Sequence, residues 1–207
     1  MRYRRDSSSG DDAAACGGAN VTTLVVALEA YCHLDGCAWS AFSPDDDSYE
    51  LTFGAPLLLN CIDLDRTARN WTTCARLPPE CPVRLALEMH DNGAGNITAA
   101  AAAVAALPVN ELKLDGRWRE DNVAVLARAL GARLQLLSAR GCGLDTLTAR
   151  VTAALPELVL LSVPDNAMAA LGPDAMAPLA KLEHADLASN GLRDLDAQSK
   201  WALRRTG

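Results

Sequence analysis

Aromatic residues, histidines and long apolar runs are scarce in this sequence. Phe, Trp and Tyr make up 4% of its 207 residues, although half of the residues are hydrophobic. The longest candidate membrane span, residues 99–109, is alanine-rich and about half as long as a bilayer requires, so no transmembrane helix is predicted. The net charge of −7 argues against a dedicated nucleic-acid binder, because neutralising phosphates requires clustered lysine and arginine. Aliphatic richness without aromatics instead favours a repeated packing unit.

Motifs of common catalytic and cofactor sites are also absent. The sequence contains no P-loop, no Gly-x-Ser-x-Gly and no Gly-x-Gly-x-x-Gly motif. The acidic run at residues 45–47 lacks the spacing and the glycine of a calcium loop. Cys32 and Cys37 are followed by no second close pair, which disfavours zinc. We expect no enzymatic activity, no metal and no cofactor.

A repeat of about 24 residues dominates the second half of the chain. From Leu182 the sequence follows the pattern LxxLxLxxNxLxxL, with one alanine at a leucine position. Equal steps back along the chain give matches that begin at Leu158 and Leu134, the latter with Cys142 at the asparagine position. That position explains Cys142 better than a reactive thiol does. Two further steps of similar length give weaker matches from Val109 and Arg84, and a still weaker turn begins at Leu59.

The pattern predicts a leucine-rich-repeat solenoid of α/β class. Alternating apolar residues mark short strands with one buried face, and such strands stack into a parallel sheet. The asparagine buries its amide where the chain leaves the strand and replaces backbone pairings lost at the turn. Leu107, Leu155 and Leu179 tether the return segments to the core, and residues 121–130 and 173–179 are predicted as single helical turns on the convex side.

The same register defines a solvent-facing side of the predicted sheet. This side is polar and acidic at its N-terminal end and more apolar at Leu136 and Leu160. In solenoids this face, or its flank, is the usual partner surface. The alternative is that these are ordinary solvated strand residues. Ala86, Pro164 and Ala188 complete this face, and its predicted ligand-binding residues are Glu88, His90, Glu111, Lys113, Asp115, Ser138, Arg140, Ser162, His184 and Asp186. His90 and His184 lie four strands apart, about 19 Å, too far to share a metal.

Cysteines and glycosylation sequons point to an oxidising compartment. Disulfide candidates cluster in the segment before the clean repeats and are Cys32, Cys37, Cys61, Cys74 and Cys81. Asn20, Asn70 and Asn96 begin N-x-Thr sequons, of which Asn70 and Asn96 are the predicted glycosylation sites. The basic start and the apolar run Leu24–Leu28 resemble a poor signal peptide with cleavage after Ala30; the alternative is an N-terminus without a signal.

Residues 31–82 are predicted to form a cysteine-rich cap with a degenerate first repeat. Strands are expected over 49–53 and 57–62. The Leu-Asp-Gly-Cys, Ser-Tyr-Glu-Leu and Leu-Asn-Cys segments, with residues 87–98 resembling a first repeat, make the chain similar to the N-terminal part of an invertebrate Toll or Toll-like receptor ectodomain. Leucine-rich repeats are expected over 83–200, after a poorly ordered start at 1–30 and before a truncated end at 201–207.

The resemblance implies extracellular binding of a cystine-knot cytokine of the Spätzle type, a second receptor chain, and innate immune or developmental signalling. The further repeats, C-terminal cap, membrane helix and signalling domain of such receptors are missing, so the chain is interpreted as a fragment that reaches the membrane only through those parts. No nucleic acid or small-molecule substrate is expected. The alternatives are a stand-alone secreted leucine-rich-repeat recognition or decoy protein, and an intracellular interaction scaffold.

Overall fold

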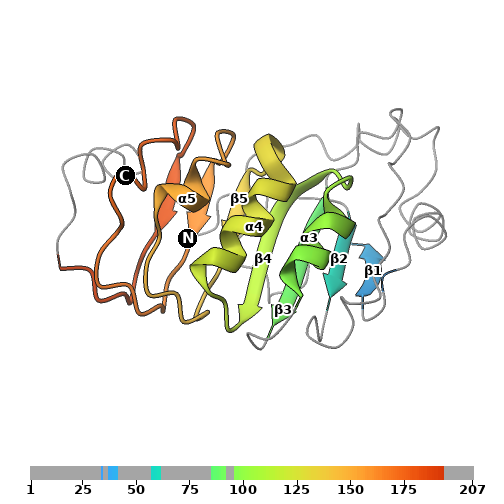
Figure 1. Ribbon diagram of the computed structural model, residues 1–207, viewed down its shortest axis with the longest axis horizontal. Helices are drawn as coiled ribbons and strands as arrows, with labels where there is room; N and C mark the ends of the chain where they lie inside the picture. The colour runs from blue at the N-terminus through green and yellow to red at the C-terminus, as the bar shows by residue number, and fades with distance from the viewer. Residues whose placement is uncertain (1–33, 35–36, 42–56, 62–84, 92–95, 194–207) are drawn as a thin grey trace.

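The computed structural model describes residue 34 and residues 37–41, 57–61, 85–91 and 96–193 (Figure 1). Seven strands form one sheet whose order follows the chain. The strands are β1 (Cys37–Ala41), β2 (Leu57–Cys61), β3 (Leu85–Asp91), β4 (Val109–Gly116), β5 (Leu136–Ser138), β6 (Leu160–Ser162) and β7 (His184–Asp186). The helices are α3 (Ile97–Val104), α4 (Glu120–Leu130), the 3₁₀ turn η2 (Gly131–Arg133) and α5 (Ala149–Thr152). No helix in these ranges is long and apolar enough to cross a membrane.

Six of the strands are parallel and one is not. β1 pairs with β2 in antiparallel orientation, and β2 to β7 are parallel to their neighbours. Lys113 on β4 pairs with Ser138, Ser138 with Ser162, and Ser162 with Asp186, so partners on successive strands are separated by one length of the predicted repeat. The predicted parallel sheet and its register over these strands are therefore confirmed.

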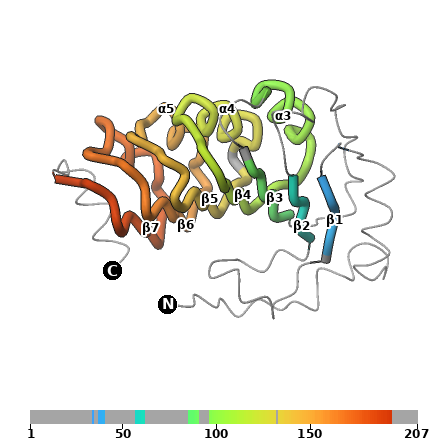
Figure 2. The backbone as a smooth tube through the Cα atoms, turned by 90° about the horizontal axis from the view of Figure 1, so that it is seen from below, coloured from blue at the N-terminus to red at the C-terminus, as the bar shows by residue number. Residues whose placement is uncertain are grey.

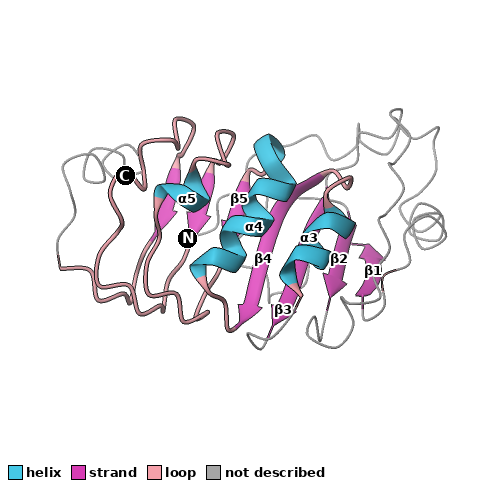
Figure 3. Ribbon diagram, viewed as in Figure 1, coloured by secondary structure: helices cyan, strands magenta, loops and turns pink. Residues whose placement is uncertain are grey.

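The helices lie together on one face of the sheet, which we call the helix face (Figures 2 and 3). Every second strand residue points to this side, and Leu87, Leu112, Leu137 and Leu161 are fully or almost fully buried in the core there. The predicted tethers Leu107, Leu155 and Leu179 are buried in the same core. The alternation of apolar residues thus places the core on one side of the sheet.

Local signals set the bounds of the helices. Asn96 precedes α3, and its side chain accepts a hydrogen bond from the backbone N–H of Ala99 at 3.2 Å, as an N-cap does. Glu120 and Asp121 lie in the first turn of α4, and Arg128 lies in its last turn. At these ends, both the negative and the positive charges interact favourably with the helix dipole. Gly131 follows α4 with a positive φ of 59°.

Two predicted convex segments differ from the structure. Residues 121–130 belong to an 11-residue helix rather than a single turn, because helix formers and charges of the right sign at both ends sustain it. Residues 173–179 form turns without a helix. Pro178 has no backbone N–H to donate and restricts the residue before it, which keeps that segment out of a regular helix.

The weak repeat starting at Leu59 has the wrong register. Leu59 pairs with Leu87, and Leu87 pairs with Leu112, so Leu59 occupies the fourth position of the repeat rather than the first. The alternation Leu57, Leu59 and Cys61 decides this register, because these side chains are fully buried on the helix face. The predicted strand at 57–62 is present as β2, and the predicted strand at 49–53 lies outside the described residues.

A disulfide bond joins β1 to β2. It links Cys37 to Cys61, two of the predicted candidates, and crosses the antiparallel pair at the N-terminal edge of the sheet. The other three candidates, Cys32, Cys74 and Cys81, lie outside the described residues. The two bonded cysteines have a sequence separation of 24, so the bond closes a loop that restricts the unfolded chain at this edge.

Candidate protein-binding surface

The face of the sheet opposite α3, α4 and α5 holds none of the described helices, and we call it the helix-free face. Its residues align across the strands in two rows that follow from strand pairing. One row is Asn60, Glu88, Lys113, Ser138, Ser162 and Asp186. The other is Leu58, Ala86, Glu111, Leu136, Leu160 and His184. The structure therefore brings the predicted ligand-binding strand residues onto one surface, where His90 also pairs with Asp115.

Solvent exposure along this surface is uneven. Asp115, Arg140 and Asp186 are exposed. Ala188 is exposed as well, and Glu88, His90, Lys113, Ser138 and His184 are partly buried. All of these residues have access to solvent and line the surface from β3 to β7.

Other predicted solvent-facing residues are buried, which corrects the sequence-based expectation. Glu111 and Ser162 have exposed fractions of 0% and 3%, and Pro164 is also buried. Ala86, Leu136 and Leu160 are buried as well. Strand alternation assigns a side chain to a face of the sheet, but it does not determine whether other parts of the chain cover that face.

A histidine between two carboxylates lies at the N-terminal side of the surface. The His90 ring nitrogen Nδ1 is 2.9 Å from Asp115 Oδ2, and Nε2 is 3.2 Å from Glu88 Oε1. Within the described ranges, no group of three or more His, Cys, Asp or Glu side chains is arranged to hold a metal ion.

Lys113 is a partly buried cation on the same surface. Its burial lowers the pKa of the ammonium group from its ordinary value of 10.5, while the carboxylates of Glu111 and Glu88 oppose that shift. Glu111 is itself fully buried next to Lys113. The middle of the helix-free face therefore holds a charged group that has lost much of its hydration.

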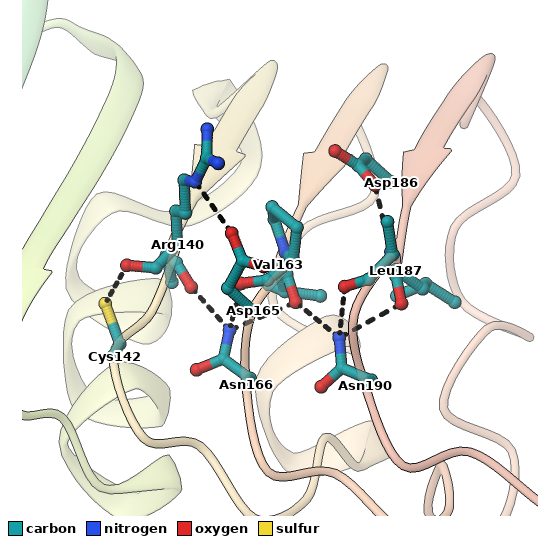
Figure 4. A network of polar contacts seen from close by, with 11 residues as sticks. Arg140, Cys142, Val163, Asp165, Asn166, Asp186, Leu187 and Asn190 are labelled. Atoms are coloured by element: carbon teal, nitrogen blue, oxygen red, sulfur yellow. Dashed lines mark hydrogen bonds and ion pairs between the residues drawn. The ribbon is translucent and has the colours of Figure 1, made fainter.

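An exposed ion pair lies further along the surface. Arg140 Nε is 2.9 Å from Asp165 Oδ2, and both side chains are well exposed. Asp186 Oδ1 accepts a hydrogen bond from the backbone N–H of Ala188 at 3.0 Å. These contacts orient exposed charges of both signs, as Figure 4 shows for Arg140, Asp165 and Asp186.

Below this surface, Asn166 and Asn190 fill equivalent positions after β6 and β7 (Figure 4). Asn166 Nδ2 donates to the carbonyl oxygens of Ala139, Val163 and Pro164 at 2.7, 3.0 and 3.1 Å. Its Oδ1 accepts from the backbone N–H of Leu144 at 3.0 Å.

Asn190 repeats the arrangement one unit further on. Its Nδ2 donates to Val163, Leu187 and Ala188, and its Oδ1 accepts from the N–H of Met168 at 3.3 Å. Each amide thus joins its own turn to the preceding one, as predicted for the asparagine position.

Cys142 fills the equivalent position after β5. Its Sγ lies 3.2 Å from the Leu114 carbonyl oxygen and 3.4 Å from that of Arg140, and the residue is buried. Burial, with a smaller contribution from the Asp115 carboxylate, raises the pKa of this thiol to about 12. The structure therefore confirms the predicted turn position of Cys142, and it disfavours a thiolate there at neutral pH.

In the four units from β4 to β7, the residue before the asparagine position has a left-handed backbone. Gly116, Gly141, Asp165 and Ser189 have φ of 92°, 62°, 57° and 54°. One such residue occurs in each of these four units. Glycine at the first two positions is a signal that sequence reasoning missed, because glycine adopts positive φ at no steric cost.

Sequence reasoning also missed two polar contacts that fix the unit around β4 and α4. The indole N–H of Trp118 donates to the Asp115 carbonyl oxygen at 2.8 Å, and Trp118 is buried. Glu120 Oε1 accepts hydrogen bonds from the backbone N–H and the hydroxyl of Thr148. No spacing rule in the repeat pattern marks either residue.

Of the two predicted glycosylation sites, Asn96 lies in the described residues and Asn70 lies outside them, as does the sequon at Asn20. Asn96 is exposed, and its Oδ1 is the atom that caps α3. The cap therefore leaves Nδ2, the atom to which a glycan attaches, free of that hydrogen bond.

No protein-family model matches the sequence, and a search of curated proteins finds no match.

Proposed function

We propose that the chain is a leucine-rich-repeat solenoid that recognises a protein partner through its helix-free face. The proposal places it in the extracellular part of a Toll-type receptor that binds a cystine-knot cytokine of the Spätzle type. Three features that recur once per unit support the repeat: strand pairing, the polar turn position and the left-handed residue before it. Stacked units of this kind leave one sheet face as an extended binding surface.

The alignment of the predicted ligand-binding residues into rows is the observation that supports recognition of a protein partner. Asp115, Arg140 and Asp186 come from three different units and are all exposed on or beside one face. Oriented charges of both signs offer electrostatic complementarity to a folded partner, which sets specificity and association rate.

The Cys37–Cys61 disulfide and the exposed sequon at Asn96 favour an extracellular setting for this function. A stand-alone secreted recognition or decoy protein would use the same surface. A transcript that continues into a membrane helix and a signalling domain would exclude that alternative.

Charge reversal on the two faces tests the proposal. We expect a recombinant Spätzle-type cytokine to bind the chain, and Arg140→Glu combined with Asp186→Lys to weaken binding at least tenfold, about 1.4 kcal/mol. Arg128→Glu, at an exposed position on α4, is the matched control and should leave the affinity unchanged. Thermal unfolding of each variant verifies the fold. Absence of binding, or equal losses for both faces, would contradict the proposal.

A further inference from the structure

Asn190 is followed by glycine, whereas Asn166, at the equivalent position one unit earlier, is followed by alanine. Deamidation begins when the backbone nitrogen of the following residue attacks the asparagine side chain, and glycine has no Cβ to hinder that approach. The two asparagines otherwise make equivalent contacts (Figure 4). The other Asn-Gly pair of the chain, Asn92-Gly93, lies outside the described residues.

The backbone N–H next to the asparagine is held in one of these turns and not in the other. The N–H of Ala167 donates to the carbonyl oxygen of Leu144 at 2.9 Å. Within the described residues, the equivalent N–H of Gly191 donates to no acceptor. A hydrogen-bonded N–H must give up its acceptor before the nitrogen can attack, so the nitrogen of Gly191 is the more available of the two.

The two side-chain amides also differ in burial and in their hydrogen bonds. Asn166 has an exposed fraction of 8%, and its Oδ1 accepts from the N–H of Leu144 at 3.0 Å. Asn190 is only partly buried, and its Oδ1 accepts from the N–H of Met168 at 3.3 Å. Ring closure requires the amide to turn toward the following nitrogen, and the longer contact and greater exposure of Asn190 favour that movement.

We propose that Asn190 is a site of spontaneous deamidation in the folded chain. The backbone nitrogen of Gly191 loses its proton to solvent and forms a bond to Cγ of Asn190. The bond between Cγ and Nδ2 then breaks, and the amide nitrogen takes up a proton from solvent and leaves as ammonia. Water opens the resulting succinimide at either of its carbonyls. The products are aspartate and isoaspartate, and in isoaspartate the backbone runs through the former side chain.

The carboxylate of either product cannot replace the amide. Nδ2 of Asn190 donates to the carbonyl oxygens of Val163, Leu187 and Ala188. An ionised carboxylate only accepts hydrogen bonds, so it would face three acceptors and repel them. Deamidation therefore breaks the contact that joins the turn after β7 to the β6 unit, and it adds a negative charge to that turn.

This modification makes the contact between the last two described units dependent on the age of the molecule. Molecules lose the contact one after another, at a rate set by the attack of the Gly191 nitrogen. The turn after β6 keeps its amide, because Asn166 has neither the glycine nor the available N–H. The inference goes beyond the proposed function and does not depend on whether a partner binds.

Peptide mapping of the intact folded protein, incubated at mildly alkaline pH, tests the inference. Cleavage after Arg150, Lys181 and Arg193 places Asn166 and Asn190 in separate peptides. Mass spectrometry with chromatographic separation then measures aspartate and isoaspartate at each position. Asn190 should convert at least about tenfold faster than Asn166. Circular dichroism during the incubation verifies that the protein remains folded.

Two variants separate the effect of the fold from that of the Asn-Gly pair. A Cβ added at Gly191 meets its nearest atom, the Met168 carbonyl oxygen, at 3.5 Å, which is an ordinary contact. Gly191→Ala should therefore fold and slow the conversion of Asn190 at least about tenfold. The matched variant Ala167→Gly creates an Asn-Gly pair at Asn166 and should leave Asn166 the slower site, since its N–H is held by Leu144.

Three results would overturn the proposal. One is equal conversion of Asn166 and Asn190 in the natural sequence. Another is an unchanged rate at Asn190 in Gly191→Ala. The third is conversion of Asn166 in Ala167→Gly as fast as that of Asn190, which would show that the turn geometry has no part in the reaction.

Discussion

A buried side-chain amide such as that of Asn166 replaces several backbone pairings at once. At the turn after β6, Asn166 donates to the carbonyl oxygens of Ala139, Val163 and Pro164 and accepts from the N–H of Leu144. Backbone groups buried without a partner cost about 1–3 kcal/mol each. Single residues of this kind therefore hold neighbouring units together.

Asn166→Ala should lower the free energy of unfolding by about 2–4 kcal/mol, because it leaves these buried groups without the amide. Asn190→Ala is the matched control at the equivalent but more exposed position, and its loss should be clearly smaller. Urea denaturation followed by circular dichroism measures both. Equal losses, or no loss for Asn166→Ala, would show that the amide contacts do not join the units.

Cys142 carries a prediction about pH. Its thiol pKa is raised to about 12 in the folded chain from 9.0, so between these values the folded state binds more protons than the unfolded state. The stabilisation associated with this protonated thiol is thus present below pH 9 and declines as the pH rises toward 12. Iodoacetamide at pH 9 should alkylate Cys142 about 500-fold more slowly in the folded protein than in urea, as the thiolate fractions at these two pKa values require. Similar rates in a protein that remains folded would contradict the buried thiol position.

At the scale of elements, the positions of β2 to β7 followed from the sequence, whereas β1 and the return segments did not. Leucines such as Leu137 and Leu161 must alternate with outward residues, so their spacing determines both the strand and its register. A return segment needs only to cover the core within a fixed length, and a helix or a series of turns can do so. α4 and residues 173–179 show both solutions.

The turn that follows each strand carries a prediction at this scale. Ser189 has a φ of 54°, so Ser189→Gly should stabilise the protein by about 0.5–1 kcal/mol by relieving backbone strain. Gly141→Ala at the equivalent position should destabilise it by about 1 kcal/mol, and because an added Cβ meets no atom within 4 Å, the cost is conformational.

Ser138→Gly provides the control for that comparison, since Ser138 lies in the extended backbone of β5 and glycine there weakens a strand. Thermal unfolding of the three variants measures the signs. Destabilisation by Ser189→Gly as large as that by Ser138→Gly would contradict the repeated left-handed turn.

For the whole molecule, the sequence predicted which residues share the helix-free face but not which of them meet solvent. Glu111 and Lys113 lie on that face as the alternation requires, yet Glu111 is fully buried. Such burial depends on contacts between segments far apart in the chain, and the period of the repeat contains no information about them. The Cys37–Cys61 pairing was likewise undetermined, because spacing alone does not select one pair among the candidate cysteines.

Glycosylation tests the compartment in which the molecule folds. If the chain is secreted, Asn96 should carry a glycan that peptide N-glycosidase removes, detected as a mass shift of the peptide containing it. Thr98→Ala destroys the sequon without changing the Asn96 cap of α3, so it should abolish the shift and leave stability nearly unchanged. An unmodified Asn96 in secreted material would contradict the prediction at this site.

The central claim is that exposed residues from successive units form one partner surface, and carboxylate labelling of the cytokine complex tests it most directly. Asp115 lies at the helix-free face with 66% of its side chain exposed, and Asp121 on α4 is a matched control at 60%. The account predicts that bound cytokine reduces the labelling of Asp115 and Asp186 together and leaves that of Asp121 unchanged. Reduced labelling of Asp121, with Asp115 and Asp186 unaffected, would contradict it.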